Sequence, residues 1–288
     1  MDKNTSAKIK LIVCRVLAYG FLLFLTVLCL GIFYILLVNS TKSHSELQGN
    51  FVPFFSTHLF KNIANAFNPQ NTETVDILVG FKNSIFVSAL TAILTTYFSA
   101  LTAYGVYAYR FKGRKIVAAF ILGIMMIPSQ VSSVGFFVLC SDMGLTNNLW
   151  MLIIPAIAAP SVYFYMIQYL KASLPLELVE ASRMDGSSEF MTFNRIVLPI
   201  MKPAIAVQMI FSFVASWNNF YMPGLLIDQE GKRTLPLMLM QLRSVEVSGA
   251  DAGQIWMFIL LSILPVVFVY LILSKSIIKG VTSGSVKG

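Results

Sequence analysis

Long apolar runs separated by short polar segments dominate the hydrophobicity pattern of this chain. Each run lacks Asp, Glu, Lys and Arg and is long enough to cross a bilayer, which takes about 20 helical residues. The runs cover residues 16–38, 83–107, 116–140, 150–170, 204–227 and 255–273. This pattern predicts an all-α, polytopic membrane protein with six transmembrane helices.

The first run follows a basic stretch, residues 1–15, and is too long for the apolar core of a signal peptide. No small-residue cleavage pattern follows it, and Cys29 lacks the small residue that precedes a lipoprotein cysteine, so we expect an uncleaved helix. Residues 39–82 are polar and hold the only histidines, His44 and His58. No third ligand is apparent, and we expect ordinary surface residues there. The cysteines show no metal spacing and are expected to pack.

Composition agrees with a membrane protein. Hydrophobic residues make up 57% of the chain and charged residues 12%, and the mean hydropathy is +0.75. A soluble domain carries about 25% charged residues. The net charge of +8 does not indicate nucleic-acid binding, because the basic residues lie at the ends of apolar runs. They concentrate at the N-terminus, at 110–115, at 171–202 and in the tail, so the positive-inside rule predicts that these segments are cytoplasmic.

The apolar runs also limit the chemistry that the chain can perform. A charge at mid-bilayer costs roughly 2.5 to 3.5 kcal/mol, so acids and bases in spans usually mark proton or ion pathways. The runs contain none, which argues against a proton-coupled carrier. They also contain no histidine, no aspartate pair and no zinc spacing, so we expect no catalytic residue, no metal site and no enzyme. A glycine-rich phosphate loop is absent as well, and any ATP must be bound by another chain.

The segment 173–203 is far more charged than the apolar runs beside it, and its sequence predicts a helical hairpin. Ser173 can cap the first helix, Pro175 fits its first turn, and Glu177 suits the positive end of its dipole. Gly186 permits the left-handed backbone conformation that ends this helix.

The second helix of the hairpin is expected from Ser187 or Ser188 to about Val197, because Pro199 disfavours helix just before itself. Each helix carries an apolar stripe that needs a packing partner, either the protein's own helix ends or another protein. The stripes are Leu176, Val179 and Met184 on the first helix and Phe190, Phe193, Ile196 and Val197 on the second.

The spacing within this hairpin resembles the cytoplasmic coupling-loop signature of permease subunits in binding-protein-dependent ABC importers, Glu-Ala-Ala-x-x-x-Gly-x9-Ile-x-Leu-Pro. Ser182 departs from it by replacing the second alanine, a small-for-small change. The resemblance implies a type I ABC importer transmembrane domain whose hairpin docks into a cleft on an ATP-hydrolysing subunit. The residues implied in this coupling are Glu180, Ala181, Ser182, Asp185, Gly186, Ile196, Leu198 and Pro199.

Further segments are similar to the carbohydrate-uptake branch of these permeases, in particular to the shorter permease of maltose-type and multiple-sugar importers. Asn219 departs from that branch, where Asp is common. The similar segments are Asn-Asn-Leu-Trp at 147–150, Leu-Pro-x-Glu-Leu at 174–178, Phe-x-x-x-Trp-Asn-x-Phe-x-x-Pro at 213–223, Thr-Leu-Pro-Leu at 234–237 and the ending at 279–288.

Amides and aromatic rings bind sugar hydroxyls and sugar rings, which suggests candidates for the substrate pathway. They are Trp217, Asn218, Asn219 and Tyr221 in the fifth run, together with Gln130, Tyr163 and Tyr165. An open alternative is that the fifth-run group bridges helices or lines the interface. Gln130 follows Pro128, and the carbonyl that a mid-span proline frees needs a neighbour or cavity water, so we expect this kink to face the interior.

The resemblance implies a division of the chain into a tail, first transmembrane helix and extracytoplasmic segment (1–78), a permease domain (79–276) that includes the hairpin (173–203), and a cytoplasmic tail (277–288). It also implies partners in a prokaryotic plasma membrane: a second homologous permease, two ATP-binding subunits and an extracytoplasmic sugar-binding protein, which the loop 228–254 is expected to face. ATP and Mg would be bound by the partner ATPase and no cofactor by this chain. The alternatives are an importer of the same architecture for a non-sugar solute and a standalone secondary carrier.

Overall fold

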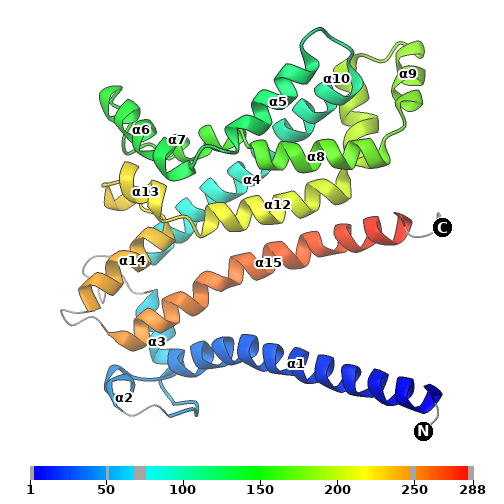
Figure 1. Ribbon diagram of the computed structural model, residues 1–288. Coiled ribbons are helices and arrows are strands. Elements are labelled where there is room, and N and C mark those ends of the chain that lie inside the picture. The colour runs from blue at the N-terminus through cyan, green and yellow to red at the C-terminus, as the bar shows by residue number, and fades with distance from the viewer. Residues whose placement is uncertain (1–2, 50–51, 68–75, 247–250, 285–288) are drawn as a thin grey trace. The chain divides into compact units, whose positions relative to one another are not determined.

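The computed structural model describes residues 3–49, 52–67, 76–246 and 251–284, and all its regular elements within these ranges are helical (Figure 1). The longer helices are α1 (Lys3–Ser40), α4 (Ile77–Ala108), α5 (Arg114–Ile124), α6 (Ser129–Asp142), α8 (Pro160–Ser173), α9 (Leu176–Met184), α12 (Lys202–Trp217), α14 (Leu235–Glu246) and α15 (Ala252–Gly284). The shorter ones are α2 (His44–Gln48), α3 (Leu59–Ala66), α7 (Trp150–Ile153), η2 (Pro155–Ile157), α10 (Glu189–Thr192), η3 (Phe193–Val197), α11 (Leu198–Ile200), α13 (Tyr221–Leu226) and η4 (Glu230–Lys232).

Four segments of the described chain are long and apolar enough to cross a membrane, and up to six are if each of two sharply bent helix pairs counts as one span. The four are Leu11–Ser40, Ile77–Ala108, Trp150–Ser173 and Ala252–Lys275. They contain the predicted first, second, fourth and sixth runs. The all-helical, multi-pass prediction is therefore confirmed.

The other two predicted spans are sharply bent helix pairs, and the fourth is itself divided into α7, η2 and α8. The third run is divided into α5 and α6, which meet at 92° around Pro128. The fifth run is α12, which ends at Trp217, followed by the separate helix α13, and α12 meets the helix before it at 82°. Proline has no backbone N–H, so it leaves a carbonyl of the preceding turn without its helical donor, and neighbours or cavity water must satisfy that carbonyl.

Two polar segments that were predicted as loops contain helices. Residues 228–246 form η4 and α14, while 247–250 lie outside the described residues. The segment 39–82 contains α2 and α3 and the start of α4, where the Asp76 carboxylate accepts hydrogen bonds from the backbone N–H groups of Leu78 and Val79. Local capping extends α4 beyond its apolar run.

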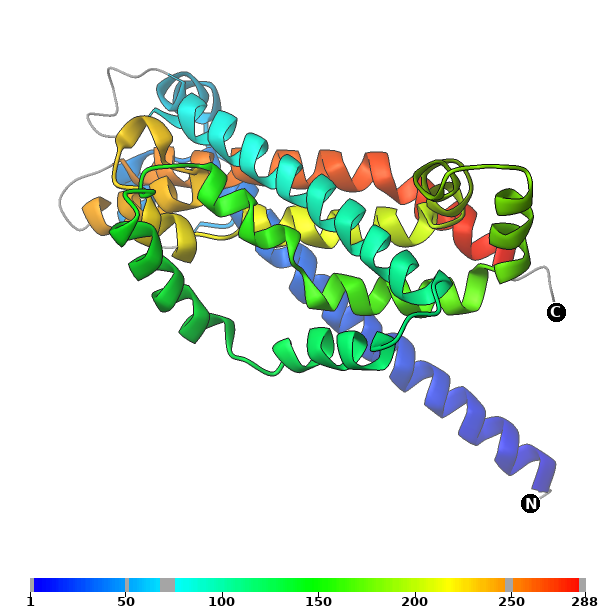
Figure 2. The ribbon, with the colours of Figure 1, turned by 90° about the horizontal axis from the view of Figure 1, so that it is seen from above.

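The chain divides into two compact units. The first consists of Met1–Glu73 with Arg243–Leu261, and the second of Thr74–Leu242 with Ser262–Gly288. In the second unit α4 packs along α12 and α8 (Figures 1 and 2). Ala100 and Ala103 of α4 are completely buried at the centre of this packing. Small side chains let helices approach closely within a bilayer, and the second run is rich in Ser, Thr and Ala.

Two regions lie at opposite ends of the α4–α8–α12 packing. The helices α9 and α10 lie at the end where α4 finishes, and α6 and α13 lie at the other end (Figures 1 and 2). The first region contains the predicted hairpin. The second contains a broad cavity, described below.

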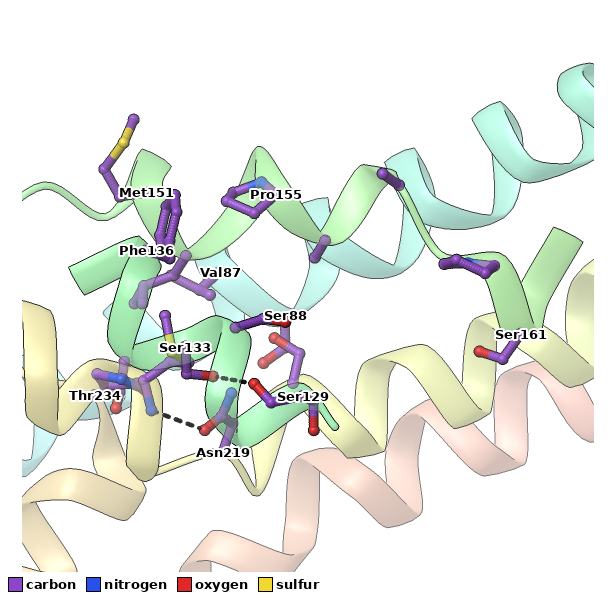
Figure 3. A pocket seen from close by; sticks show the side chains of 18 of the residues that line it. Val87, Ser88, Ser129, Ser133, Phe136, Met151, Pro155, Ser161, Asn219 and Thr234 are labelled. Carbon is purple, nitrogen blue, oxygen red and sulfur yellow. Dashed lines mark hydrogen bonds between the residues drawn. The ribbon is translucent and has the colours of Figure 1, made fainter. Parts of the chain in front are cut away.

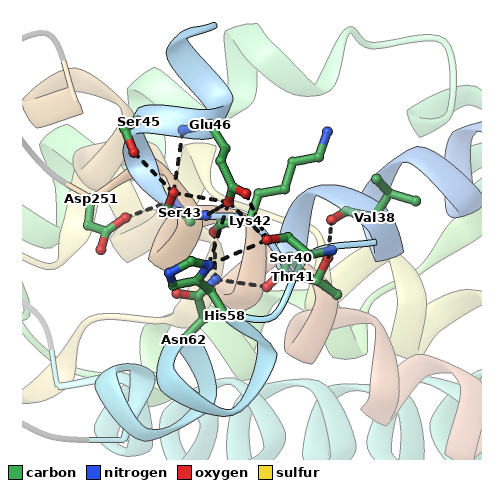
Figure 4. A network of polar contacts seen from close by, with 12 residues as sticks. Val38, Ser40, Thr41, Lys42, Ser43, Ser45, Glu46, His58, Asn62 and Asp251 are labelled. Carbon is green, nitrogen blue, oxygen red and sulfur yellow. Dashed lines mark hydrogen bonds and ion pairs between the residues drawn. The ribbon is translucent and has the colours of Figure 1, made fainter. Parts of the chain in front are cut away.

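In the first unit a polar network joins the end of α1 to the segment that follows it (Figure 4). The side-chain amide of Asn62 donates to the carbonyl oxygens of Ser40 and Lys42, both at 2.9 Å. Thr41 donates to the carbonyl of Val38 and accepts from the backbone N–H of Ser56. The network satisfies backbone groups that the end of a helix leaves without partners.

Both histidines of this unit take part in protein contacts. Nδ1 of His44 accepts a hydrogen bond from the backbone N–H of Ala252, and Nδ1 of His58 lies 3.5 Å from the Glu46 carboxylate. The backbone N–H of Ser43 and the hydroxyl of Ser56 hold the pKa of Glu46 below its usual value. Within the described residues no group of three His, Cys, Asp or Glu side chains is placed to hold a metal ion.

Gly253 provides a test of this unit. A Cβ atom there would collide with the carbonyl oxygen of Lys42 and lie 3.0 Å from Nδ2 of Asn62. Gly253→Ala should therefore destabilise the packing of α15 on this turn by about 1–3 kcal/mol, the usual cost of overpacking. Faster amide hydrogen exchange over residues 38–66 of the detergent-purified chain would show this. Gly31→Ala, where nothing lies within 4 Å of the added Cβ, is the matched control, and equal exchange in the two variants would contradict the prediction.

Candidate functional site: a helical hairpin and a polar cavity

The predicted hairpin is formed by α9 and the helix that begins at α10, and glycine sets its turn. Gly186 has φ of +78°, a conformation that side chains with a Cβ rarely adopt. Its N–H donates to the carbonyl of Arg183, and the N–H of Ser187 donates to that of Ser182. These two bonds form a Schellman motif, which satisfies carbonyls at the end of a helix. The role predicted for Gly186 in ending the first helix is confirmed.

The predicted cap of the first helix is wrong. Ser173 is the last residue of α8, and its hydroxyl donates to the carbonyl of Tyr169 at 2.6 Å, so it does not cap α9. The residue that precedes α9 is Pro175, in extended conformation and without a side-chain cap. At the start of the second helix the prediction is confirmed, because the Ser188 hydroxyl accepts from the N–H of Met191.

The second helix does not stop near Val197 as predicted. It continues through a π-helical turn, Phe193–Val197, and the short helix Leu198–Ile200. In the π turn the N–H of Leu198 bonds to the carbonyl of Phe193, one residue further back than in an α-helix. The wider turn coincides with Pro199, whose ring would clash with the carbonyl four residues earlier in a regular helix. The chain then bends by 82° into α12.

An ion pair closes the hairpin and ties it to α4. Nε of Arg183 lies 2.6 Å from Oε1 of Glu189, across the turn. The hydroxyl of Tyr104 in α4 donates to the other carboxylate oxygen at 2.9 Å, and the Arg183 guanidinium lies 5.2 Å from the ring centre of Tyr109. The hydrogen bond to Glu189 raises the pKa of Arg183 further, so the guanidinium stays charged. Sequence reasoning missed this network, because its residues are separated by up to 85 positions.

A second polar contact lies inside the hairpin. The hydroxyls of Ser182 and Thr192 are 2.6 Å apart, and Thr192 donates to Ser187 at 3.1 Å. Ser182 is 5% exposed and Thr192 is fully buried. The serine that departs from the family signature therefore binds the opposite helix, which alanine could not do.

The apolar stripes of the hairpin are divided between two surroundings. Val179, Phe193 and Val197 are buried in the protein's own core, as one alternative expected. Met184 and Phe190 are instead 88% and 68% exposed. The outer face of the hairpin adds the exposed residues Glu180, Ala181 and Asp185, whereas Ile196 and Leu198 are half-buried and Pro199 is exposed nearer α12.

A cavity of about 680 Å³ lies within the second unit (Figure 3). Its wall includes two interrupted stretches of the chain: the bend between α5 and α6, and the segment from α7 through η2 to α8. Its polar side chains are seven serines, Thr234 and Asn219, and none of its lining residues is charged. Irregular backbone at membrane depth is tolerated where it is buried in protein or lines a water-filled cavity.

Of the predicted substrate residues only Asn219 lines this cavity. Trp217 is 2% exposed, is stacked on Phe213 with ring centres 5.7 Å apart, and donates from Nε1 to the carbonyl of Ser262. It bridges helices, which was the alternative reading for that group. Tyr163 is buried in the core of the unit.

The remaining candidates for the substrate pathway, Gln130, Tyr165, Asn218 and Tyr221, are exposed and lie outside the cavity wall. Within the fifth run, α12 ends at Trp217, so Asn218 and Asn219 follow the helix and have different surroundings from Trp217.

Sequence reasoning missed most of the cavity wall, including Ser88 and Thr234. Ser88 is 1% exposed and Thr234 is 4% exposed, and neither hydroxyl has a hydrogen-bond partner in the described part of the chain. Leaving such a group unsatisfied costs about 1–3 kcal/mol. The serines of the second and third runs were the available signal, but single serines in spans usually mark helix contacts.

Comparison with known proteins agrees with this geometry. Residues 92–282 match the family described as binding-protein-dependent transport system inner membrane component. The arabinooligosaccharides transport system permease protein AraQ of Bacillus subtilis (strain 168) is 34% identical over 282 residues, which cover 96% of this chain and 97% of that protein. The trehalose/maltose transport system permease protein MalG of Thermococcus litoralis is 29% identical over 268 residues, covering 92% and 94%.

A solved structure has the same fold. A chain of a bacterial ABC transporter involved in the import of the acidic polysaccharide alginate superimposes with a TM-score of 0.74, covering 91% of this chain and 96% of that chain at 19% identity. The chain therefore belongs to the family of binding-protein-dependent transport system inner membrane components. It is a multi-pass permease subunit of an ABC importer, a transport component rather than an enzyme, and it works with other transporter subunits.

The ion pair across the hairpin can be tested by removing its charge. Arg183→Gln should weaken the closed hairpin by about 0.2–1 kcal/mol, because both partners are partly exposed and water screens the pair. Hydrogen exchange of the α10 amides should then accelerate roughly up to fivefold. Arg195→Gln changes an exposed cation of the same hairpin outside this network and should leave the exchange as it is in the wild type. Identical exchange in the two variants would contradict a stabilising role.

Proposed function

We propose that this chain is a membrane-spanning permease subunit of an ATP-driven sugar importer, in which it forms half of the translocation pathway and couples to an ATPase through the hairpin. The observation that carries the proposal is the outer face of that hairpin. Met184 and Phe190 are exposed on the outer face of a charged hairpin whose inner side packs in the protein's own core. Exposed apolar groups with a polar rim are typical of a protein-binding surface.

A sugar is the solute class that the relatives and the cavity support together. The related permeases are named for arabinooligosaccharides, trehalose and maltose, and lactose. The uncharged cavity wall, with its serine hydroxyls, suits a neutral solute that forms many hydrogen bonds. A charged solute would lose its hydration there without gaining a counter-charge, which disfavours the non-sugar importer of ions, phosphates or polyamines.

The importer would contain a second homologous permease, two ATP-binding subunits that bind ATP and Mg, and an extracytoplasmic sugar-binding protein. Both termini and the hairpin would be cytoplasmic, since the basic residues concentrate on those segments. Within the chain we retain the proposed division into 1–78, 79–276 and 277–288.

Coupling would use the contacts that bind the hairpin to α4. When the ATPase subunits close on ATP, the hairpin held in their cleft moves with them. Tyr104 links Glu189 to α4, Tyr97 donates to the side-chain oxygen of Asn194 at 3.2 Å, and Tyr107 donates to the carbonyl of Leu174 at 3.0 Å. Because these three contacts lie along one helix, the hairpin and α4 would move together as a rigid body. This movement would switch the translocation pathway between inward and outward access.

Uptake by the assembled importer tests the proposal. The tagged chain is purified with the subunits that bind it, reconstituted in vesicles and supplied with the binding protein. We expect ATP-dependent uptake of at least one sugar from a panel of arabinotriose, maltose, lactose and raffinose, and no uptake by the chain alone. Uptake by the chain without an ATPase would instead identify a standalone carrier.

Replacing Gly186 tests the hairpin within that assembly. Gly186→Val should strain the turn by roughly 1–2 kcal/mol, because a β-branched residue resists the left-handed conformation. Co-purification of the ATPase should fall about five- to thirtyfold, the factor that corresponds to this energy, with membrane insertion unchanged. Gly186→Asn is the matched control, since asparagine adopts this conformation more readily, and it should retain most of the ATPase. Full retention by the valine variant would contradict hairpin docking.

A further inference from the structure

Two buried hydroxyls in the cavity have no partner within the protein. Ser88 and Thr234 both line it, and both hydroxyl oxygens are enclosed without a hydrogen bond in the described residues. Figure 3 shows the two residues at the cavity, on separate elements. Buried side-chain polar atoms are nearly always satisfied, so two exceptions in one cavity indicate that a group from outside the chain completes them.

The hydroxyls of α4 occur in two states. Ser88 and Thr91 are buried without a partner among the described residues, and of these two only Ser88 lines the cavity. The hydroxyls of Thr96 and Thr102 each donate to the carbonyl four residues earlier, at 2.7 Å and 2.8 Å. Ser88 makes no such bond. Bonding to the preceding turn is the ordinary solution for these residues in a helix, and its absence at Ser88 leaves the donor available to another molecule.

Asn219 provides an amide group on the same wall. Its side-chain oxygen accepts a hydrogen bond from the backbone N–H of Met222 at 3.2 Å, which fixes the orientation of the amide. The NH₂ group then has no partner among the described residues, and Asn219 itself lines the cavity. The cavity thus offers two hydroxyls, which donate or accept, and one amide donor.

We propose that this cavity is a solute subsite carried by this permease itself, in which Ser88, Thr234 and Asn219 bind the hydroxyls of a neutral sugar. The inference rests on the proposed function, to which it adds the residues that hold the solute. Hydroxyls of a sugar both donate and accept, so one molecule can satisfy all three groups. The volume of about 680 Å³ lies within the roughly 300–1,000 Å³ of ligand sites, and Phe136 and Met151 supply apolar surface for the ring.

The chief competing occupant is a helix of the second permease. Two features favour a solute. Two breaks in the backbone, between α5 and α6 and between α7 and α8, face this cavity. Irregular backbone at the depth of the bilayer requires polar partners or water, which an apolar helix would exclude. The wall also lacks the charge that would orient a partner. The experiment distinguishes the two occupants.

Cysteine protection in the assembled importer tests occupancy. Ser133 of α6 lines the cavity and Ser141 of the same helix is exposed outside it, so Ser133→Cys and Ser141→Cys form a matched pair in a background without Cys14, Cys29 and Cys140. A small water-soluble thiol reagent is applied with and without arabinotriose, maltose, lactose or raffinose. We expect at least one sugar to slow labelling at position 133 about fivefold or more, with position 141 unaffected.

Two results would overturn the subsite. Equal labelling at position 133 with and without every sugar would mean that no sugar binds there. Absence of labelling at 133, while 141 is labelled, would mean that a segment of the second permease fills the cavity. Sugar uptake driven by ATP together with either result would refute the subsite alone, whereas absence of any ATP-driven uptake would refute the proposed function.

Removing the hydroxyls identifies the binding residues. Ser88→Ala combined with Thr234→Val deletes two groups that make no bond within the protein, so the fold should be retained. The sugar concentration that gives half-maximal protection should rise at least roughly fivefold, the factor expected for one lost hydrogen bond. Ser99→Ala, a buried change on the same helix outside the cavity, should leave that concentration at the wild-type value. An unchanged concentration in the double variant would remove these residues from the site.

Discussion

The close approach of α4 to α8 and α12 is the contact on which both functional regions depend. Ala100 and Ala103 have no exposed surface at this contact. Between helices in lipid there is little hydrophobic driving force, so the packing depends on small side chains that allow many short contacts. The hairpin binds α4 at Tyr104 and the cavity wall contains Ser88, which are about 24 Å apart along the helix. A single rigid helix therefore carries the two regions.

The hairpin is stiff for reasons that belong to its own structure. Its turn is fixed by the left-handed conformation of Gly186 and by two backbone hydrogen bonds. The Ser182–Thr192 contact joins its two helices, and the Arg183–Glu189 ion pair joins them again across the turn. Each of these interactions contributes little by itself. A surface ion pair contributes about 1 kcal/mol or less to stability, and a single hydrogen bond contributes up to about 1.5 kcal/mol. Together they make the hairpin stiff, so a displacement of the hairpin moves α4 and α12 instead of deforming the hairpin.

The cavity follows from a different constraint. A bilayer offers no water to a broken helix, so the interruptions near Pro128 and Pro155 must face a polar interior. The structure turns both toward one cavity, along with serines from several helices. The sequence predicted that the Pro128 kink faces the interior, because one proline is a local signal. It could not predict which side chains meet there, because Ser88 and Thr234 lie far apart in the chain and share a wall only after folding.

The sequence by itself determined the membrane class, the four long apolar spans, the hairpin and its glycine turn, because these depend on local composition, spacing and backbone conformation. Tertiary structure decided which polar residues line the cavity and that Trp217 bridges helices instead. It also decided that Glu189 pairs with Arg183 and binds Tyr104, and that the second hairpin helix continues past Pro199 through a π turn. These outcomes depend on contacts between distant residues, and helix packing rather than any local preference selects among them.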